Sequence, residues 1–191
     1  MAPKKKFSKQ QIVDAAFDIA RVEGMDSITI RKVAEKLGSS IAPIYVNFQD
    51  VDELINDVIQ KVFTISHEMV REQNSGSPFR DIGIASLKFA KEYSVLFREL
   101  TFNKNKYSYD YDEEIGDDLV ELMKEDPDLK GFTEEELRSI LLKMKIFQTG
   151  LTVLIANDSL PEGLREENLI EMLDSMSDDV IRSTRLRKET M

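Results

Sequence analysis

The side chains that most often act in catalysis or bind metals are scarce in this sequence. It has one histidine, His67, and no cysteine, which excludes disulfide bonds and thiolate metal sites. The segment His67-Glu-Met-Val-Arg71 begins like the helix of zinc proteases, but Arg71 stands where the second histidine ligand belongs. We find no glycine-rich phosphate loop and no nucleophile elbow. The sequence therefore predicts neither an enzyme nor a metal site, and no cofactor is expected.

Charge is distributed unevenly along the chain, whose formal net charge is −10. Residues 1–50 carry eight Lys and Arg against six Asp and Glu, a net charge of +2, and residues 51–191 carry −12. Any nucleic-acid contact is therefore expected in the N-terminal quarter, because the acidic remainder repels phosphate. The sequence shows neither a signal peptide nor an apolar stretch of the roughly 20 residues that span a bilayer, so we expect a cytoplasmic protein with no membrane partner.

Short amphipathic segments in the first fifty residues predict a helix-turn-helix. Thr29 is expected to cap one short helix, and Gly38 is expected to adopt the left-handed conformation that ends it. Ser39 or Ser40 is expected to cap the next helix, in which Pro43 is tolerated because it lies in the first turn. Two short helices joined by a tight turn with glycine are typical of this DNA-binding motif.

The remaining sequence also reads as helices, so the predicted fold class is all-α. Capping boxes begin helices at Ser8 and Thr133, and the two long helices at the C-terminal end are expected to form an antiparallel pair. A polar, tyrosine-rich loop is expected over residues 103–111. The predicted domains are an N-terminal three-helix helix-turn-helix module over residues 1–50 and a helical body for effector binding and dimerisation over residues 51–191.

The stretch ITIRKVAEKLGSSIAPIYVNFQDVDEL, residues 28–54, resembles the signature of the tetracycline-repressor (TetR/AcrR) family of transcriptional regulators. The shared features are a threonine, an apolar residue followed by alanine, a Gly-x-Ser turn and a Tyr-x-x-Phe motif before a leucine-bearing helix. The resemblance covers residues 8–60 well and the rest only in the number and order of helices. Two departures make the recognition surface more apolar than usual: Val51 replaces a lysine, and Ile41 replaces a polar or basic residue.

The resemblance implies a ligand-responsive regulator, a repressor that binds a pseudo-palindromic operator in double-stranded DNA as a homodimer. It implies that Thr29 and Tyr45 contact phosphate, that Arg31 contacts a base edge or the backbone, and that Ser40 caps the recognition helix. The residues implied to face the groove are Ile41, Ala42, Pro43, Val46 and Asn47, and the basic residues Lys4, Lys5 and Lys6 are candidates for a mobile arm.

For the body, the resemblance implies dimerisation through the C-terminal helix pair and a ligand cavity among the preceding helices. An apolar, aromatic cavity suits a lipophilic effector, whose binding would release the protein from DNA. The candidate cavity residues are Phe63, His67, Phe89, Tyr93, Phe97, Phe102 and Phe147.

Each of these assignments has an alternative that the sequence leaves open. At helical spacing the aromatic residues are more often part of an ordinary core, His67 is compatible with a surface position, and the lysine run with a solubilising tail. Gly150 costs about 1 kcal/mol of helix stability relative to alanine, so it is either a point of close helix approach in the dimer or a tolerated defect. The alternative for the whole chain is a helical protein-interaction module that has lost sequence-specific DNA binding.

Overall fold

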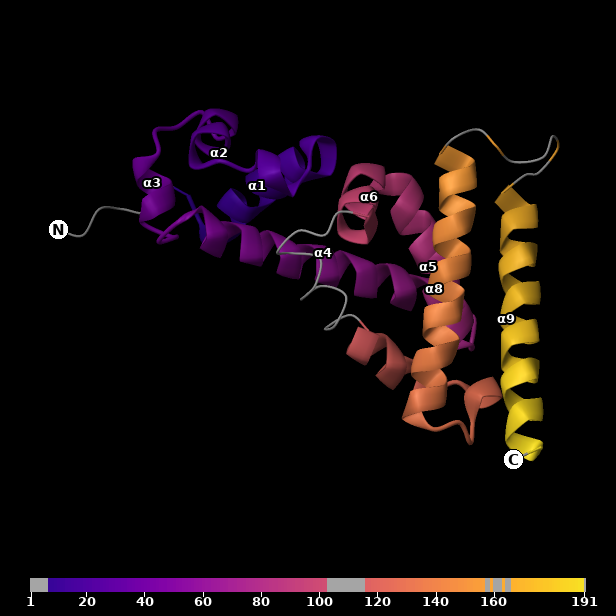
Figure 1. The fold of residues 1–191 in the computed structure, drawn as a ribbon. Helices are drawn as coiled ribbons and strands as arrows, with labels where there is room; N and C mark the ends of the chain where they lie inside the picture. The colour runs from indigo at the N-terminus through magenta and orange to yellow at the C-terminus, as the bar shows by residue number, and fades with distance from the viewer. Residues whose placement is uncertain (1–6, 103–115, 157–158, 160–162, 164–165, 191) are drawn as a thin grey trace. The chain divides into compact units, whose positions relative to one another are not determined.

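A computed structural model of the 191-residue chain describes residues 7–102, 116–156, 159, 163 and 166–190. Every regular element among these residues is a helix, which confirms the predicted all-α class (Figure 1). None of the described helices is long and apolar enough to cross a membrane. Lys4, Lys5 and Lys6 and the predicted loop over residues 103–111 lie outside the described residues.

The chain divides into two compact units. Unit 1 comprises residues 1–65 and 92–111, and unit 2 comprises residues 66–91 and 112–191. The long helix α4, Val51–Gln73, contributes residues to both units. Unit 1 is thus larger than the DNA-binding module predicted for residues 1–50, and the functional boundary at residue 50 stays a prediction.

Unit 1 consists of α1 (Lys9–Glu23), the 3₁₀ turn η1 (Met25–Ser27), α2 (Ile30–Lys36), α3 (Ala42–Tyr45), the first part of α4, and α6 (Ser94–Phe102). The capping box predicted at the start of α1 is present: Gln11 N donates to the Ser8 hydroxyl over 3.1 Å, and Ser8 N donates to the Gln11 side chain over 2.9 Å. Helix α1 packs against both α2 and α6. The apolar positions at helical spacing in these elements form a buried core that includes Ile12, Ala16, Val33, Ile44, Phe48 and Leu54.

A buried carboxylate joins α6 to the connection between α1 and α2. Glu99 on α6 is 7% exposed and accepts a hydrogen bond from Met25 N at 2.6 Å. The preceding residue, Gly24, has φ +91°, and a Cβ atom there would lie 2.9 Å from Glu99 Oε2. Glycine is therefore needed at this position both for its backbone conformation and for the space it leaves. The Glu99 contact fixes the entry to α2, the first helix of the predicted helix-turn-helix.

The start of α3 differs from the prediction. Ile41 occupies the N-cap position: its carbonyl accepts from Ile44 N at 3.1 Å, and its side chain makes no capping hydrogen bond. The prediction that Ser39 or Ser40 caps this helix is therefore wrong. Helix α3 is a single turn that contains Pro43, which has no N–H group, so few amide groups remain for a cap to satisfy.

Unit 2 contains the end of α4, α5 (Pro78–Glu92), a helix over residues 116–124, the 3₁₀ turn η2 (Pro127–Leu129), α8 (Glu134–Ala156) and α9 (Glu166–Glu189). Helices α8 and α9 form the predicted antiparallel pair (Figure 1). The capping box of α8 is present, because Thr133 N donates to the Glu136 carboxylate at 2.6 Å and Glu136 N donates to the Thr133 hydroxyl at 3.3 Å. The core of this unit includes Phe79, Ile82, Val120, Met123, Leu137, Ile140, Met144 and Leu173.

A second buried carboxylate fixes the turn between α4 and α5. Asp126 is 2% exposed and accepts hydrogen bonds from the Ser77 hydroxyl at 2.7 Å and from Phe79 N at 2.9 Å. It thereby satisfies one of the free N–H groups at the start of α5. The break that the sequence predicts at residues 74–78 is therefore a defined turn, tied to the segment that precedes η2.

Candidate nucleic-acid interface

The N-terminus of α2 is capped as predicted and leaves one arginine available. The Thr29 hydroxyl accepts from Lys32 N at 3.2 Å. Two lysines of α2 turn back to carboxylates of α1, with Lys32 Nζ 2.6 Å from Glu23 and Lys36 Nζ 3.3 Å from Asp18. Arg31 is exposed and forms no ion pair within the described part of the chain. It is the basic side chain of α2 that can reach a ligand without breaking a contact.

The turn from α2 to α3 is set by Gly38. This residue has φ +60°, as the sequence predicts, and nothing lies within 4 Å of a Cβ placed there. Backbone conformation alone therefore favours glycine at this position. Gly38 N donates to Glu35 O at 3.0 Å and Ser39 N donates to Ala34 O at 2.9 Å, so the last carbonyl groups of α2 are satisfied. These bonds set the angle at which the chain enters α3.

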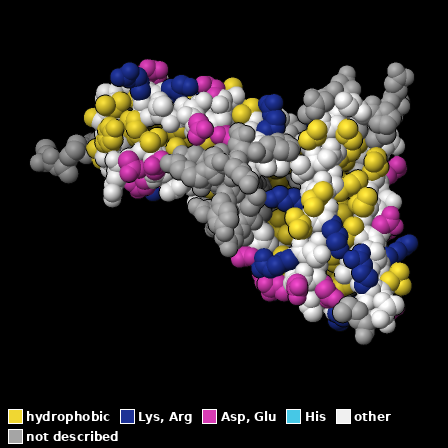
Figure 2. Space-filling model, in the orientation of Figure 1, with side chains coloured by type: hydrophobic (Ala, Val, Ile, Leu, Met, Phe, Trp, Pro, Cys, Tyr) yellow, Lys and Arg dark blue, Asp and Glu magenta, His cyan; other side chains and the backbone are white. Residues whose placement is uncertain are grey.

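Helix α3 buries one side and exposes an apolar surface on the other. Ile44 and Phe48 are 0% and 2% exposed, which confirms that they face inward. On the opposite side Ile41, Tyr45 and Val46 are 48%, 54% and 47% exposed, and Ala42 is also exposed. We call these four residues the α3 surface. Figure 2 shows hydrophobic side chains gathered over α3, and the sequence has no charged residue between positions 37 and 49.

Two residues predicted to face the groove have other environments. Asn47 is half-buried, and its Nδ2 donates to Pro43 O at 2.9 Å and to Phe7 O at 3.5 Å. This amide nitrogen holds the C-terminal end of α3 against the start of α1 and is not free to read a base. Pro43 itself is half-buried, whereas Ser40 is exposed beside the α3 surface.

Ion pairs brace the helix-turn-helix on α4. Lys9 Nζ lies 2.7 Å from Asp57, and this hydrogen bond raises the pKa of Lys9. Lys61 on α4 pairs with Asp14 on α1, and its hydrogen bond lowers the pKa of the Asp14 carboxyl group. The Lys61 ammonium also lies 5.0 Å from the centre of the Phe17 ring, a cation–π contact. The N-terminal half of α1 is thus held on α4 by two ion pairs beside a buried apolar core.

The seven candidate cavity residues fall into both units. Phe63, Tyr93 and Phe97 belong to unit 1, where Tyr93 packs edge-on against Phe17 with ring centres 5.8 Å apart. His67, Phe89 and Phe147 belong to unit 2, where His67 Nε2 lies 3.5 Å from Asp118. Phe63 and Phe89 are buried, and the side chain of Phe102 lies outside the described residues. Their shared role as cavity lining stays a prediction.

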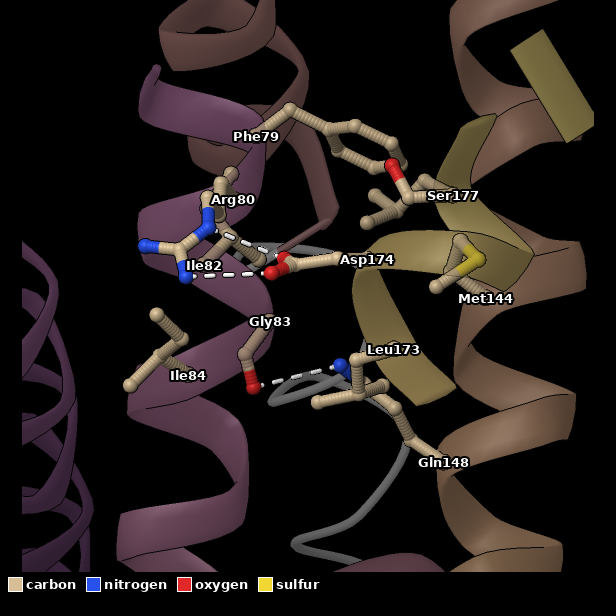
Figure 3. A pocket seen from close by; sticks show the side chains of 11 residues that line it. Phe79, Arg80, Ile82, Gly83, Ile84, Met144, Gln148, Leu173, Asp174 and Ser177 are labelled. Carbon is tan, nitrogen blue, oxygen red and sulfur yellow. Dashed lines mark hydrogen bonds and ion pairs between the residues drawn. The ribbon is translucent and has the colours of Figure 1, made fainter. Parts of the chain in front are cut away.

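A cleft in unit 2 has a different lining. It lies between α5, α8 and α9, is open to solvent, and has a cavity volume of only about 20 Å³. Figure 3 shows Arg80 and Asp174 at this cleft, joined by two hydrogen bonds of 2.9 and 3.1 Å that raise the pKa of Arg80. Gln148 Nε2 donates to Gly83 O at 3.3 Å beside them. None of the seven candidate residues lines this cleft, and sequence reasoning missed the Arg80–Asp174 pair, whose members are 94 positions apart.

A second apolar surface lies on α8. Leu142, Ile146, Val153 and Leu154 are 58%, 64%, 39% and 44% exposed, and their spacing puts them on one side of the helix. We call these residues the α8 face. Gly150, which is exposed, falls in the same register, and a Cβ there would meet nothing within 4 Å. Figure 2 shows hydrophobic side chains gathered over α8, and Met172 on the neighbouring α9 is 40% exposed.

The fold is that of TetR-like transcriptional regulators. No protein-family model and no curated protein matches the sequence. Among solved structures, the fatty acid degradation regulator FadR from Bacillus halodurans matches with a TM-score of 0.60 and 18% identity, over 93% of this chain and 97% of that one. A TetR-like transcriptional regulator from Rhodococcus sp. RHA1 matches with a TM-score of 0.57 and 17% identity, over 95% of both chains.

A Clostridium perfringens protein, provisionally named a fatty acid metabolism regulator, matches with a TM-score of 0.58 and 18% identity, over 90% of this chain and 97% of that one. At such identities the likeness shows a shared fold. It confirms the architecture that residues 28–54 imply, and it extends over nearly the full length of the chain, including the body for which the sequence resemblance is weak.

Proposed function

We propose that this protein is a transcriptional regulator that binds a pseudo-palindromic DNA operator as a homodimer and leaves it when a small lipophilic effector binds. The observation that carries the proposal is the geometry of α2 and α3. A capped α2, whose Arg31 has no ion pair among the described residues, leads through a left-handed Gly38 into a short helix with an exposed outer side. This is the arrangement that inserts a recognition helix into the major groove.

The proposed DNA contacts divide into positioning and reading groups. The exposed hydroxyl groups of Thr29, Ser40 and Tyr45 and the exposed Arg31 side chain can donate to phosphate oxygens and fix the protein on the duplex. The α3 surface then lies in the groove. Lys4, Lys5 and Lys6 remain candidates for an additional basic arm, whereas Asn47 is withdrawn from the proposed interface because its amide is bonded within unit 1.

The α8 face supports dimerisation through a second copy of α8 and α9. Apolar residues gathered on one side of a long helix are the pattern that packs one helix against another. Exposed residues of both charges lie on the two helices, Lys145 on α8 and Asp178 and Asp179 on α9. A two-fold axis would bring α8 of each copy to α9 of the other. Two copies would present their recognition helices to successive major grooves about 34 Å apart.

The names of the structural neighbours bear on the effector. Two of them are named as regulators of fatty acid metabolism or degradation, and fatty acyl compounds are lipophilic, as the predicted aromatic cavity requires. We propose that effector binding in the body favours a spacing of the two helix-turn-helix units that no longer fits the operator. Helix α4 can carry the change, since it is one helix with residues in both units. Leaving the operator would then permit transcription, so the protein acts as a cytoplasmic repressor.

The test is an unbiased selection of bound duplexes from a random DNA library at moderate salt. We compare the intact protein with an Arg31→Ala/Tyr45→Ala double variant and with a Lys36→Ala control, whose lysine is paired with Asp18. The proposal expects an enriched inverted repeat that the double variant loses and the control retains. Absence of enrichment at every salt concentration, from a folded dimer, would refute sequence-specific DNA binding.

That negative outcome would favour the second candidate function, a helical protein-interaction module. The specific observation in its favour is the apolar character of the α3 surface, which lacks the basic side chains that usually accompany DNA contact. Purified protein that dimerises but enriches no DNA would support it.

A further inference from the structure

The α3 surface offers almost no hydrogen-bonding group to a partner. Ile41, Ala42 and Val46 have hydrocarbon side chains, and the Tyr45 hydroxyl is the one polar side-chain group that the four residues carry. The N–H groups of Ile44 and Tyr45 are used within the helix by the carbonyl of Ile41. Two amide side chains lie nearby: that of Asn47 donates to Pro43 O and Phe7 O, and that of the exposed Gln49 follows the end of α3.

Sequence readout in the major groove normally uses such groups. Arginine and lysine donate to guanine, asparagine and glutamine pair with adenine, and acidic residues accept from cytosine. The α3 surface presents none of these side chains. The remaining feature that distinguishes base pairs in the groove is the 5-methyl group of thymine, which is recognised by apolar contact. A surface of two branched aliphatic side chains and one alanine can make that contact and no other kind of base readout.

We infer that the α3 surface specifies thymine, through contacts of Ile41, Ala42 and Val46 with 5-methyl groups, so that each operator half-site is rich in A·T pairs where α3 lies. This inference rests on the proposed DNA-binding function and names the bases that the site reads. Tyr45 and Arg31 hold the helix in the groove, since both side chains are exposed and both carry donors for phosphate. Arg31 can also read a guanine at the edge of the half-site.

The size of the α3 surface favours DNA over a protein partner. It consists of four residues around a single helical turn, with α2 on one side and α4 following it in the chain. A stable protein interface buries about 800 Å² on each partner and typically engages 20 or more residues. The major groove, about 12 Å wide, admits one helix and needs no larger surface. Exposed donors on α2, Thr29 and Arg31, also have no obvious role against an apolar protein surface.

The experiment compares thymine with deoxyuridine in the operator obtained by selection. Deoxyuridine pairs as thymine does and lacks only the 5-methyl group. Replacing thymines one at a time is expected to weaken binding about three- to fourfold at each contacted position, from roughly 0.8 kcal/mol for a buried carbon group. Thymines outside the α3 contact are expected to bind with unchanged affinity.

Variants of the protein assign each methyl group to a side chain. Val46→Ala and Ile41→Ala are each expected to weaken binding to the thymine operator and to abolish the effect of deoxyuridine at one position of the half-site. Lys36→Ala, on the same motif but ion-paired with Asp18, should keep the full deoxyuridine effect at every position. A further operator carries cytosine at a contacted position. Replacing that cytosine with 5-methylcytosine restores a methyl group there and should recover part of the affinity.

The inference is overturned if the fully deoxyuridine-substituted operator binds as tightly as the thymine operator, while Arg31→Ala still weakens both. In that case the protein binds a specific operator by other means, and the proposed function stands. If selection enriches no operator from the folded dimer, both the proposed function and the inference fail, and the α3 surface is assigned to a protein partner.

Discussion

The α3 surface and the α8 face are both exposed and apolar, but they differ in extent and in what surrounds them. The α3 surface occupies one helical turn and borders Arg31, which has no ion-pair partner among the described residues. The α8 face runs from Leu142 to Leu154, about 18 Å along the helix at 1.5 Å per residue. It lies beside α9, which adds Met172 and a set of acidic residues. Apolar exposure alone therefore does not identify a partner.

The length of each apolar surface and the charges beside it together indicate which kind of partner that surface binds. A short apolar surface in the same motif as one exposed arginine suits a narrow, negatively charged groove whose floor carries methyl groups. A long apolar row flanked by charges of both signs suits a copy of itself. We therefore expect the two surfaces to respond differently to the same kinds of change, and each experiment below separates them.

The largest effect is expected from Ile146→Glu on the α8 face. Ile146 is 64% exposed in the single chain, so the variant should fold normally, but the dimer would bury two new carboxylates near its axis. We expect the dimer dissociation constant to rise by about 100-fold or more, equivalent to roughly 3 kcal/mol. Operator binding should fall with it, because the second helix-turn-helix is no longer tethered near its half-site. Sedimentation equilibrium measures the first effect and fluorescence anisotropy with operator DNA the second.

A matched control for Ile146→Glu is Val22→Glu. Val22 on α1 is exposed to nearly the same degree, 66%, but lies in unit 1. This variant should remain dimeric. A dimer that survives Ile146→Glu and dissociates with Val22→Glu would reverse the assignment of the two surfaces.

The next effect is expected from Arg31→Ala, which tests the cation beside the α3 surface. Loss of one such contact costs about 1–3 kcal/mol, so operator affinity should fall by roughly 5- to 150-fold. If the contact is to phosphate, the salt dependence of binding should decrease by about 0.9 for each contact removed. Dimerisation should not change. Titrations with operator DNA at several salt concentrations give both quantities.

Lys36→Ala is the control for that prediction, because it removes the same charge from the same helix. Lys36 is committed to Asp18 at 3.3 Å, an exposed pair of little energetic value, so its loss should change operator affinity by less than about threefold. Equal losses from both variants would mean that general positive charge, rather than the availability of Arg31, governs binding.

Much of the fold was predictable because local signals and burial agree. The capping boxes at Ser8 and Thr133, the Thr29 cap and the left-handed Gly38 each depend on residues within four positions of one another, and all are present. Inward-facing Ile44 and Phe48 followed from helical periodicity. The cap at Ser40 failed because a one-turn helix containing proline offers few amide groups for a cap.

Features set by contacts distant in sequence were not predictable. In the sequence, Glu99 resembles any other charged residue of an amphipathic helix. Its side chain is nevertheless buried and accepts a hydrogen bond from Met25 N, 74 positions earlier. The Arg80–Asp174 pair spans 94 positions. Asn47 looked like a base-reading amide because its residue type fits, but its partners, Pro43 O and Phe7 O, become visible only once α1 is placed. Residue types do not indicate which backbone carbonyl group a side chain will donate to.

A smaller effect is expected at Gly150, where the α8 face can be probed without adding charge. Gly150→Ala should stabilise the monomer by about 0.5–1 kcal/mol, because alanine favours the helix and its Cβ would meet nothing within 4 Å among the described residues. If the second copy approaches closely here, as the position between Ile146 and Val153 suggests, dimerisation should weaken several-fold while operator contacts by the α3 surface are unaffected. Urea unfolding and sedimentation separate the two effects. A gain in both monomer and dimer stability would instead identify Gly150 as a tolerated defect.

The smallest effect is expected from Asp14, whose ion pair with Lys61 joins α1 to α4. The Lys61 hydrogen bond lowers the pKa of Asp14, so the folded state holds this carboxylate charged where the unfolded chain, with an ordinary value of about 3.9, begins to bind a proton. The resulting stability is present above that value and is lost as pH falls through the lower pKa of the folded state. Asp14 is 47% exposed, so solvent screening limits the contribution to less than about 1 kcal/mol. Asp14→Asn should therefore be slightly less stable than the parent at pH 7 in urea unfolding, and the difference should shrink as the pH falls below the ordinary aspartate value. Because the pair lies in unit 1, dimerisation at pH 7 should be unchanged. A stability difference between the two proteins that stays constant across pH would show that Asp14 acts through shape and not through charge.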